Sequence, residues 1–323
     1  MKKIRFLLLD FSKGIKIKAP FLLIVIFSFY VGILVISDAE ALTSNLQKVK
    51  LEYYLVIFPL LALRLLIFSF RFHVLLSKTN LSSSLKESLG VYMAGLSMVL
   101  IPGGIGSLIK SYILKKKISK SYSSSVPVVV YEKWLDLTSI VIIIGFLLIW
   151  ATFIESIIVF SVGVTLCVTI IIILKKIRGF NTINRLIQKV SFLKNKSINI
   201  DEYEETINVL TKFRTNLSLL LLSIVPRLIT VVIVFLIFRS FGLDFDIFSS
   251  SQIYYTSTLI GILSFVPGGI IVTEASILGM LLHHDVEFEL ATLLVIVLRF
   301  VNIWFASIIG LVFLRLILRK IIN

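Results

Sequence analysis

The sequence has a single cysteine, Cys167, which excludes an internal disulfide and lies in an apolar run where a thiol packs as a small hydrophobic group. Acidic residues are also scarce, since 18 Asp and Glu stand against 33 Lys and Arg. The motifs GxxxxGK[ST], GxSxG and HExxH are missing, as is any Cys/His cluster. The sequence therefore gives no support for redox chemistry or for ATP-driven pumping by this chain alone.

Apolar side chains are abundant. Hydrophobic residues make up 58% of the chain and include 25 Phe, whereas soluble domains are about 45–50% apolar. The net charge of +15 would suggest nucleic acid if it lay on one face, but Lys and Arg cluster between apolar segments without interleaved aromatic residues. The composition indicates an integral membrane protein, expected in the cell (cytoplasmic) membrane, with no nucleic-acid partner.

Six segments reach the about 20 apolar residues that a membrane-spanning helix requires. They lie near 19–37, 51–76, 126–150, 157–174, 217–239 and 290–314. Shorter apolar segments flank two copies of Pro-Gly-Gly-Ile, at 102–105 and 267–270, where proline removes a backbone donor and glycine frees the dihedral angles. The flanking segments, 88–101 and 104–114 in one case and 251–265 and 268–282 in the other, predict two re-entrant helical hairpins.

The distribution of charge supports this topology. With a cytoplasmic N-terminus and hairpins that do not cross, basic clusters such as Lys115–Lys117 and Lys175–Lys176 fall inside, and so does the C-terminus. The outside segments then hold only three basic residues, Lys48, Lys50 and Arg239. Three crossings separate the hairpins, so the two halves are predicted to be inverted repeats. Pro59 and Pro226, and Arg71 and Arg239, recur at nearly the same offset as the Pro-Gly-Gly-Ile copies.

These features predict an all-α polytopic integral membrane protein of about six full transmembrane helices plus two re-entrant helical hairpins arranged as inverted repeats. The chain 1–323 is expected to form one transmembrane domain, with a first half at 19–174, a cytoplasmic loop at 175–216 and a second half at 217–323. The loop is amphipathic near 200–213 and is expected to lie along the inner membrane surface. An alternative for the first segment is a signal peptide that ends near Ala39-Glu40-Ala41.

Ionisable side chains within apolar segments cost several kcal/mol unless they are paired or hydrated, so each is a functional candidate. Glu132 and Asp136 share one helical face, and Glu274 lies in the second arm of the second hairpin. Three arginines lie within crossings, at Arg64, Arg227 and Arg299. The three acids and three arginines are expected to neutralise one another around a polar cavity. The structural alternative is that they form ion pairs or reach the membrane interface with their ends.

Each hairpin arm after Pro-Gly-Gly begins with unpaired backbone N–H groups and the positive end of a helix dipole, which favour anions. With arginines nearby, the expected ligand carries phosphate or carboxylate and has a partly apolar body, as a lipid headgroup does. The structural alternative is an ordinary tight turn. The predicted substrate and translocation residues are Arg64, Pro102, Gly103, Gly104, Gly106, Lys110, Glu132, Asp136, Arg227, Pro267, Gly268, Gly269, Glu274, Arg299 and Asn302.

Two other groups of side chains have weaker signals. His283-His284-Asp285, with Glu287 and Glu289, resembles a set of metal ligands, but adjacent His side chains diverge, so an exposed outer loop is expected and no metal or cofactor. The acidic pairs Asp38/Glu40 and Asp244/Asp246 are of the kind that membrane glycosyltransferases require for metal binding or acid–base chemistry. They keep an enzyme hypothesis open, although solvated loop charges explain them as well.

Three stretches together resemble the membrane domain of lysylphosphatidylglycerol synthases, a family also described as flippase-like: PGGIGSLIKSYIL at 102–114, EKWLD at 132–136 and PGGIIVTEA at 267–275. Ser107, Ile271 and Thr273 depart from the family pattern, so headgroup contacts there are expected to differ. In two-domain members a soluble aminoacyl-transferase domain follows, whereas this sequence ends at Asn323. The resemblance therefore implies the translocating part without the synthase.

The main hypothesis is a lipid flippase or transporter rather than an enzyme. It would move a phosphate-bearing lipid, with aminoacylated and isoprenoid-linked lipids as the classes that the resemblance implies. One alternative is a membrane enzyme or subunit in lipid-linked glycan synthesis, and another is a non-catalytic membrane partner of a separate lipid synthase. The expected partners are membrane lipids, with a separately encoded synthase or glycosyltransferase as a further option. The sequence does not predict the oligomeric state.

Overall fold

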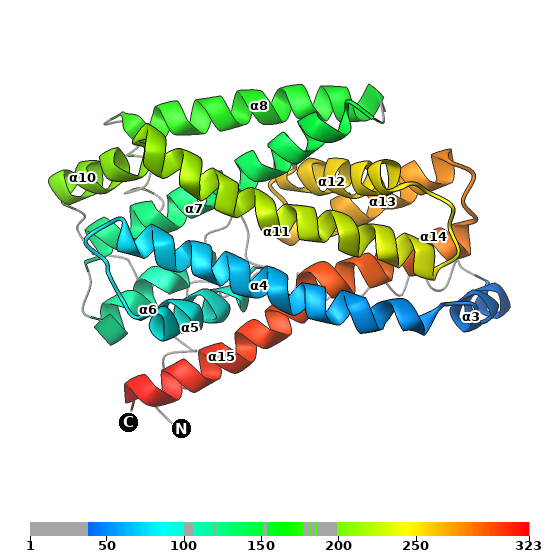
Figure 1. Cartoon of the computed structure of the whole chain (residues 1–323), viewed down its shortest axis with the longest axis horizontal. Coiled ribbons are helices and arrows are strands. Elements are labelled where there is room, and N and C mark those ends of the chain that lie inside the picture. Colours follow the sequence, from blue (N-terminus) through cyan, green and yellow to red (C-terminus); the bar gives the residue numbers. More distant parts are fainter. Residues whose placement is uncertain are drawn as a thin grey trace.

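The computed structural model describes residues 38–99, 106–118, 121–150, 154–176, 181, 185 and 199–322, and every regular element in these ranges is helical (Figure 1). This confirms the predicted all-α class. The predicted first crossing at 19–37 lies outside the described residues. The alternative of a signal peptide falls largely on the same residues, and only its end near Ala39-Glu40-Ala41 is described. Pro102, Gly103 and Gly104 of the first Pro-Gly-Gly-Ile motif lie outside the described residues as well.

The longest helices are α4 (Tyr54–Ser77), α7 (Tyr122–Leu147), α8 (Ile154–Lys175) and α11 (Phe213–Ser240). In addition, α14 (Phe288–Arg299) continues through a π-helical turn at Phe300–Trp304 into α15 (Phe305–Ile322). Four helical stretches in the described part of the chain are long and apolar enough to cross a membrane: Leu51–Ser77, Ile154–Lys175, Phe213–Ser240 and Phe288–Arg319. They coincide with four of the six predicted crossings, and α7 lies at a fifth.

Proline is tolerated inside three of these helices. Pro59 in α4, Pro127 in α7 and Pro226 in α11 each remove one backbone donor, and neighbouring helices and hydroxyl side chains compensate for such losses in membrane bundles. The carbonyl that loses its donor to Pro226 is that of Leu222, four residues earlier in α11. Helices α4 and α11, which carry the repeat landmarks Pro59 and Pro226, pack against each other.

Two pairs of short helices form hairpins at opposite ends of the bundle (Figure 1). The first pair is α5 (Leu85–Leu96) with α6 (Ile109–Ile118), and the second is α12 (Ile247–Leu263) with α13 (Val272–His283). The second hairpin reverses at Pro267–Gly269, where Gly268 and Gly269 have φ of 60° and 63°. Glycine adopts such φ values without strain, so the second Pro-Gly-Gly motif makes a tight reversal between two helices, as its composition predicts.

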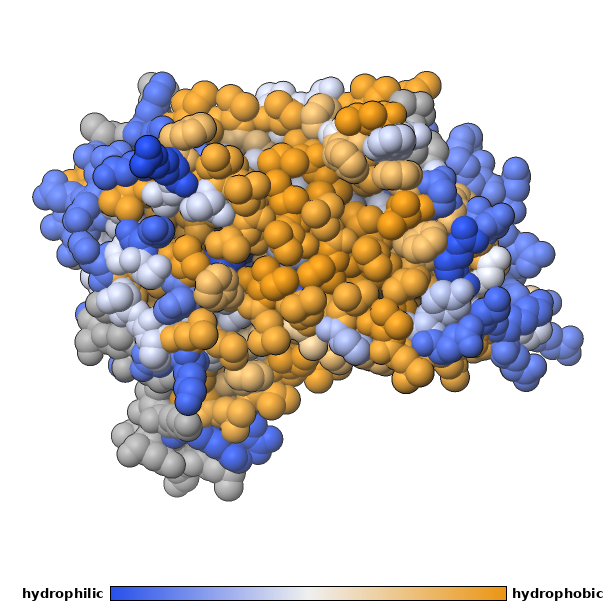
Figure 2. All heavy atoms as spheres, in the orientation of Figure 1, coloured by the Kyte–Doolittle hydropathy of each residue, from blue (hydrophilic) through white to orange (hydrophobic). Residues whose placement is uncertain are grey.

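Polar residues gather at the two ends of the bundle, and an apolar band covers the face between them (Figure 2). One end carries the short helix α10 (Ile200–Leu210), which buries Tyr203 and Ile207 against the bundle. This is the end where α8 finishes at Lys175, and we call it the basic end. The other end carries α3 (Ala39–Gln47) and the loop after α13, with Asp285 and Glu287, and we call it the acidic end.

The buried apolar side chains form two clusters, one toward each end. Along α4, Ile57 and Leu61 belong to the cluster at the acidic end, whereas Leu65 and Phe68 belong to the cluster at the basic end. The same change occurs on α7, between Leu135 and Leu137. Arg64 and Asp136 lie at these boundaries. Together with the buried charged residues next to them, which lie toward the basic end, they form what we call the polar layer.

Candidate functional site

The buried polar layer is centred on a cluster of charges from α4, α6, α7 and α11. Lys110 of α6 donates to both carboxylate oxygens of Glu132, at 2.7 and 2.8 Å, and the two side chains are 2% and 1% exposed. A guanidinium nitrogen of Arg71, on α4, lies 3.5 Å from the same carboxylate. Glu132 is therefore compensated by two buried cations, which a buried carboxylate needs in order to remain ionised.

Asp136 lies one helical turn further along α7 and contacts three cations. Arg71 donates to it at 2.7 Å, and Lys133 lies 3.0 Å from its other oxygen. Arg227 of α11 is 3.9 Å away and also donates to the Asp136 backbone carbonyl at 3.3 Å and to the Ser139 hydroxyl at 3.2 Å. We call Arg71, Lys110, Glu132, Lys133, Asp136 and Arg227 the cation-rich cluster.

Aromatic rings line the same cluster. The guanidinium groups of Arg71 and Arg227 lie 5.0 and 5.2 Å from the ring centroid of Phe68. The Lys110 ammonium lies 4.4 Å from the centroid of Tyr92 and 4.9 Å from that of Phe72. Ring faces carry partial negative charge and stabilise cations by about 0.5–2 kcal/mol each. These rings therefore help to hold more positive charge than the two carboxylates alone neutralise.

Arg64 lies two turns from Arg71 on the same face of α4 and has neutral partners. Its guanidinium donates to the side-chain oxygen of Asn302 and, at 3.4 Å, to the hydroxyl of Thr230. Among the described residues, no carboxylate lies within ion-pair distance of it, although its side chain is only 6% exposed. Asn302 lies in the π-helical turn between α14 and α15, a distortion that is frequent at functional sites.

Arg299 and Glu274 form a separate buried ion pair. The Nε of Arg299, at the end of α14, donates to Glu274 of α13 at 2.8 Å. The same guanidinium donates to the backbone carbonyl of Gly268 at 2.9 Å. The pair therefore ties both the reversal and the second arm of the α12–α13 hairpin to α14.

The charges of the polar layer do not balance. The cation-rich cluster holds four cations and two carboxylates, which leaves a formal charge of +2. Arg64 adds one more positive charge, whereas Arg299 and Glu274 cancel. Lys133 is 42% exposed, but the other cations are largely buried. A desolvated positive charge is costly, so the remaining excess favours an anionic ligand in the layer.

Comparison with known proteins matches the chain to one family. A model of the lysylphosphatidylglycerol synthase TM region matches residues 21–310, which is most of the chain. The chain belongs to the lysylphosphatidylglycerol synthase TM region family. It is also similar to a UPF0104 membrane protein of Methanocaldococcus jannaschii, with 25% identity over 237 residues that cover 69% of this chain and 95% of the relative. No solved structure matches the chain.

The structure brings four of the predicted site residues together and places the other described ones in separate groups. Lys110, Glu132, Asp136 and Arg227 meet in one cluster, and Gly106 is buried at the start of the arm that carries Lys110. The other predicted site residues that the structure describes form two groups. Arg64 contacts Asn302. Arg299 contacts Glu274 and Gly268, and Gly268 belongs to the Pro267–Gly269 reversal, in which Gly269 is buried.

The predicted pairing of three acids with three arginines holds for Glu274 with Arg299 and, at 3.9 Å, for Asp136 with Arg227, but not for the other two residues. Arg64 has no acidic partner among the described residues, and Glu132 is paired chiefly with Lys110. Arg71 is the main residue that the sequence reasoning missed, because it served only as a landmark of the repeat. The sequence could have indicated Arg71, since Arg64 and Arg71 are two turns apart on an apolar helix and therefore share a face. Its supposed counterpart Arg239 differs in environment, because it is partly exposed and pairs with Asp244.

The outer acidic residues of this family member have structural contacts. Asp38 caps α3 by accepting from the backbone N–H groups of Glu40 and Ala41. Asp246 caps α12 in the same way, with bonds of 2.7 and 2.9 Å from Phe248 and Ser249. In the described ranges no three His, Cys, Asp or Glu side chains form a group that could hold a metal ion.

Proposed function

We propose that this chain is a lipid transporter that translocates a phosphate-bearing lipid across the cytoplasmic membrane. The family places the chain among membrane proteins, and the polar layer supplies a chemical rationale for transport. A lipid headgroup would enter the layer between the two hydrophobic cores, while its acyl or prenyl tails stayed in the surrounding lipid. An aminoacylated or isoprenoid-linked phosphate lipid fits the proposal.

Arg64 is the observation that carries the proposal. A guanidinium that is 6% exposed and bonded only to two neutral groups lowers the stability of the fold. Its presence therefore suggests a functional reason. Ionisable groups at such positions in membrane proteins mark the paths of substrates and ions. A phosphate oxygen accepts well from a guanidinium, so Arg64 would hold a headgroup that has left the cation-rich cluster.

The proposed membrane arrangement has six crossings and two hairpins. The first crossing would be the segment 19–37, followed by α4, α7, α8, α11 and the continuous α14–α15 unit. The α5–α6 hairpin would enter from the cytoplasm at the basic end, and the α12–α13 hairpin from the outside at the acidic end. Both termini would be cytoplasmic. The positive-inside rule supports this orientation.

A transport assay with one substitution that removes a positive charge tests the function. We would reconstitute the protein in vesicles that contain fluorescent phosphatidylglycerol or a fluorescent isoprenoid phosphate, and follow loss of the outer-leaflet signal after addition of a membrane-impermeant quencher. The wild type should accelerate translocation of at least one of these lipids. Arg64→Gln should lower that rate about tenfold or more, since it removes a charged hydrogen-bond donor.

The control is Arg239→Gln, which removes one positive charge from a partly exposed ion pair at the acidic end. It should transport like the wild type. Arg64→Gln leaves no carboxylate unpaired, so it should unfold no more readily than the wild type, and its transport defect would not reflect misfolding. Unchanged transport by Arg64→Gln, or no acceleration of any labelled lipid by the wild type, would contradict the proposal.

The alternative of an enzyme in lipid-linked glycan synthesis has less support. It relied on the outer acidic pairs, and Asp38 and Asp246 cap helices while Asp244 pairs with Arg239. A carboxylate that caps a helix has a sufficient structural reason to be where it is. Loss of function in Asp38 and Asp246 variants that retain full stability would favour the enzyme over the transporter.

A further inference from the structure

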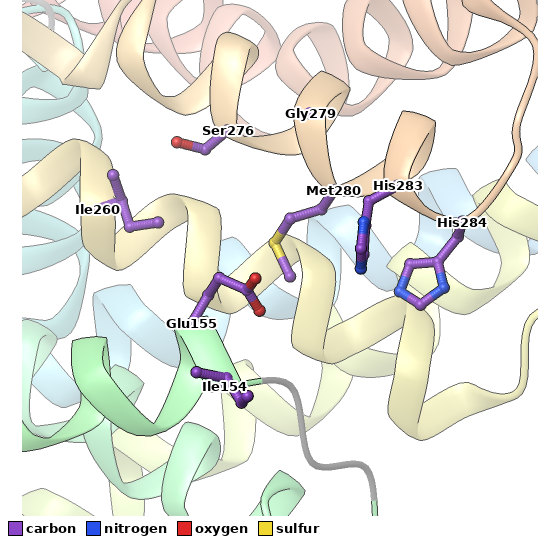
Figure 3. A pocket seen from close by; sticks show the side chains of 8 residues that line it. All are labelled: Ile154, Glu155, Ile260, Ser276, Gly279, Met280, His283 and His284. Carbon is purple, nitrogen blue, oxygen red and sulfur yellow. The ribbon is translucent and has the colours of Figure 1, made fainter.

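A second polar site lies away from the buried cations, at the acidic end. A cavity of about 570 Å³ opens between the start of α8 and the α12–α13 hairpin (Figure 3). Glu155 lies at the start of α8, His283 and His284 lie at the end of α13, and Ile260 comes from α12. A volume of this size is typical of small-molecule sites.

The polar part of this cavity favours a cation. The side chains of Glu155, His283 and His284 border the same space (Figure 3). In the part of the chain that the structure describes, no hydrogen bond or ion pair reaches the Glu155 carboxylate. The C-terminal end of α13, at His283, contributes the negative end of its helix dipole, and an imidazole nitrogen can accept from a donor. Glu155 is exposed in the first turn of α8, where its charge offsets the positive end of that helix dipole. With the end of α13 and the imidazoles, it favours an ammonium group.

The rest of the cavity is apolar and open to the lipid-facing surface. Ile260 and Met280 line it beside Gly279, where an added Cβ would meet no atom within 4 Å. The neighbouring side chains of α8, Ile154 and Ile158, are 73% and 61% exposed on a helix that is long and apolar enough to cross a membrane. A ligand in this cavity would therefore have its polar group at Glu155 and an apolar chain beside Gly279.

We propose that this cavity binds a membrane lipid with a primary ammonium headgroup. The ammonium would donate to Glu155 and to the imidazole of His283 or His284, and the beginning of an acyl chain would lie against Ile260 and Met280. A free amine would use only the polar half of the cavity, so a lipid is the occupant that fits both halves. The site shares no residue with the polar layer, and its ligand differs in charge from the anion proposed there.

The experiment measures lipid retention, which is independent of transport. Delipidated protein in detergent micelles is mixed with equal amounts of phosphatidylethanolamine and phosphatidylglycerol, and native mass spectrometry counts the bound lipids. The wild type should retain phosphatidylethanolamine in preference. Glu155→Gln should reduce that retention about tenfold and leave phosphatidylglycerol unchanged, because a charge-assisted hydrogen bond is lost.

Two further variants test the two halves of the cavity. Gly279→Leu places a side chain into the open space and should also reduce phosphatidylethanolamine retention. Glu155→Lys should reverse the preference toward phosphatidylglycerol. The matched control is Glu40→Gln, which removes an exposed carboxylate at the same end of the bundle without lining the cavity, and should behave like the wild type.

Three outcomes would overturn the proposal. The first is equal retention of both lipids by the wild type, and the second is a loss in Glu40→Gln as large as in Glu155→Gln. The third is full displacement of the lipid by soluble phosphoethanolamine, which would mean that the headgroup alone is recognised. Because retention is measured without a membrane gradient, a failure of transport leaves these results unaffected.

Discussion

The two helical hairpins share one construction with opposite charges. In the first, Lys110 on α6 donates to Glu132 on the next helix, α7; in the second, Glu274 on α13 accepts from Arg299 on the next helix, α14. In both, a glycine on the first arm makes room for the second arm. A Cβ at Gly95 would lie 2.3 Å from the Cε of Lys110, and a Cβ at Gly261 would lie 2.0 Å from the hydroxyl oxygen of Thr273.

The hairpins differ in how many partners each charge has. Glu132 contacts two cations, Lys110 and Arg71, whereas Arg299 contacts one carboxylate, Glu274, and the Gly268 carbonyl. The first hairpin therefore belongs to a network that can lose one cation and stay compensated. The second contains one buried ion pair. Under the proposed function, the first hairpin would bind the ligand and the second would be a structural anchor, and substitutions in both hairpins test this division.

The largest effect is expected from Glu274→Gln. It leaves the Arg299 guanidinium buried without an opposing charge, which costs about 3–5 kcal/mol of the free energy of unfolding. Chemical unfolding in mixed detergent micelles measures the loss. The double variant Glu274→Leu/Arg299→Met removes both charges and should recover most of it. A single variant as stable as the wild type would mean that the second pair is not an anchor.

Lys110→Met should cost less, about 1.5–3 kcal/mol, since it removes a charged hydrogen bond but leaves Glu132 beside Arg71. It also lowers the formal charge of the cation-rich cluster by one, so the translocation rate of an anionic lipid should fall more than stability does. Unfolding and vesicle transport are measured on the same preparation. A transport rate that falls only in proportion to the folded fraction would place Lys110 with the structural residues.

Gly95→Ala tests the same cluster without changing its charge. The new methyl group would displace the flexible Lys110 stem from Glu132, and overpacking of this kind costs about 1–3 kcal/mol. Gly261→Ala is the matched variant in the second hairpin, where the methyl group would meet Thr273 and the backbone of Gly269. We expect Gly95→Ala to slow transport and Gly261→Ala mainly to lower stability. The reverse result would exchange the roles of the two hairpins.

The smallest effect is expected at the start of the second hairpin, where Asp246 caps α12. Partial burial alone would raise the pKa of this carboxyl, but hydrogen bonds from Ser249 and from backbone N–H groups outweigh it, so the pKa lies below its usual 3.8. Asp246→Ala should cost about 1 kcal/mol near neutral pH. Because the folded-state pKa is lowered, the charge-dependent part is present above the unfolded-state pKa and is lost as pH falls through the folded-state value.

Unfolding of the wild type and Asp246→Ala across pH 2–7 checks the last prediction. The difference in free energy between the two proteins should shrink toward the acidic end of that range. A difference that stays constant with pH would mean that the side chain caps the helix without a contribution from its charge. Asp246→Asn, which keeps a good capping acceptor, should separate the two contributions.

Much of the fold could be predicted from the sequence, because membrane-spanning helices are encoded locally. Apolar runs of sufficient length gave the positions of α4, α8, α11 and the α14–α15 unit, and each of these is a helix in the structure. Pro267-Gly-Gly predicted a reversal, since glycine is suited to the positive φ found at Gly268 and Gly269. Helix ends were less predictable: α6 extends to Ile118, about one turn beyond the expected arm.

The candidate site could be predicted only as a set of residues. Rare charges in apolar segments pointed to Glu132, Asp136 and Arg227, since the cost of burial makes such positions conspicuous. Their partners depend on the rotation of α4, α7 and α11 about their axes, which packing decides. Arg71 therefore appeared as a landmark of the repeat, although it bridges both carboxylates of α7.

By itself the sequence determined the class, the helical segments and the excess of positive charge, because hydropathy and charge are properties of the chain. Only the tertiary structure decided which charges neutralise one another. In the structure, Glu132 contacts cations, Arg64 has neutral partners, and Arg299 forms an ion pair with Glu274. The physical reason is that a buried charge is compensated over a few ångströms, and such contacts join residues that are far apart in the sequence.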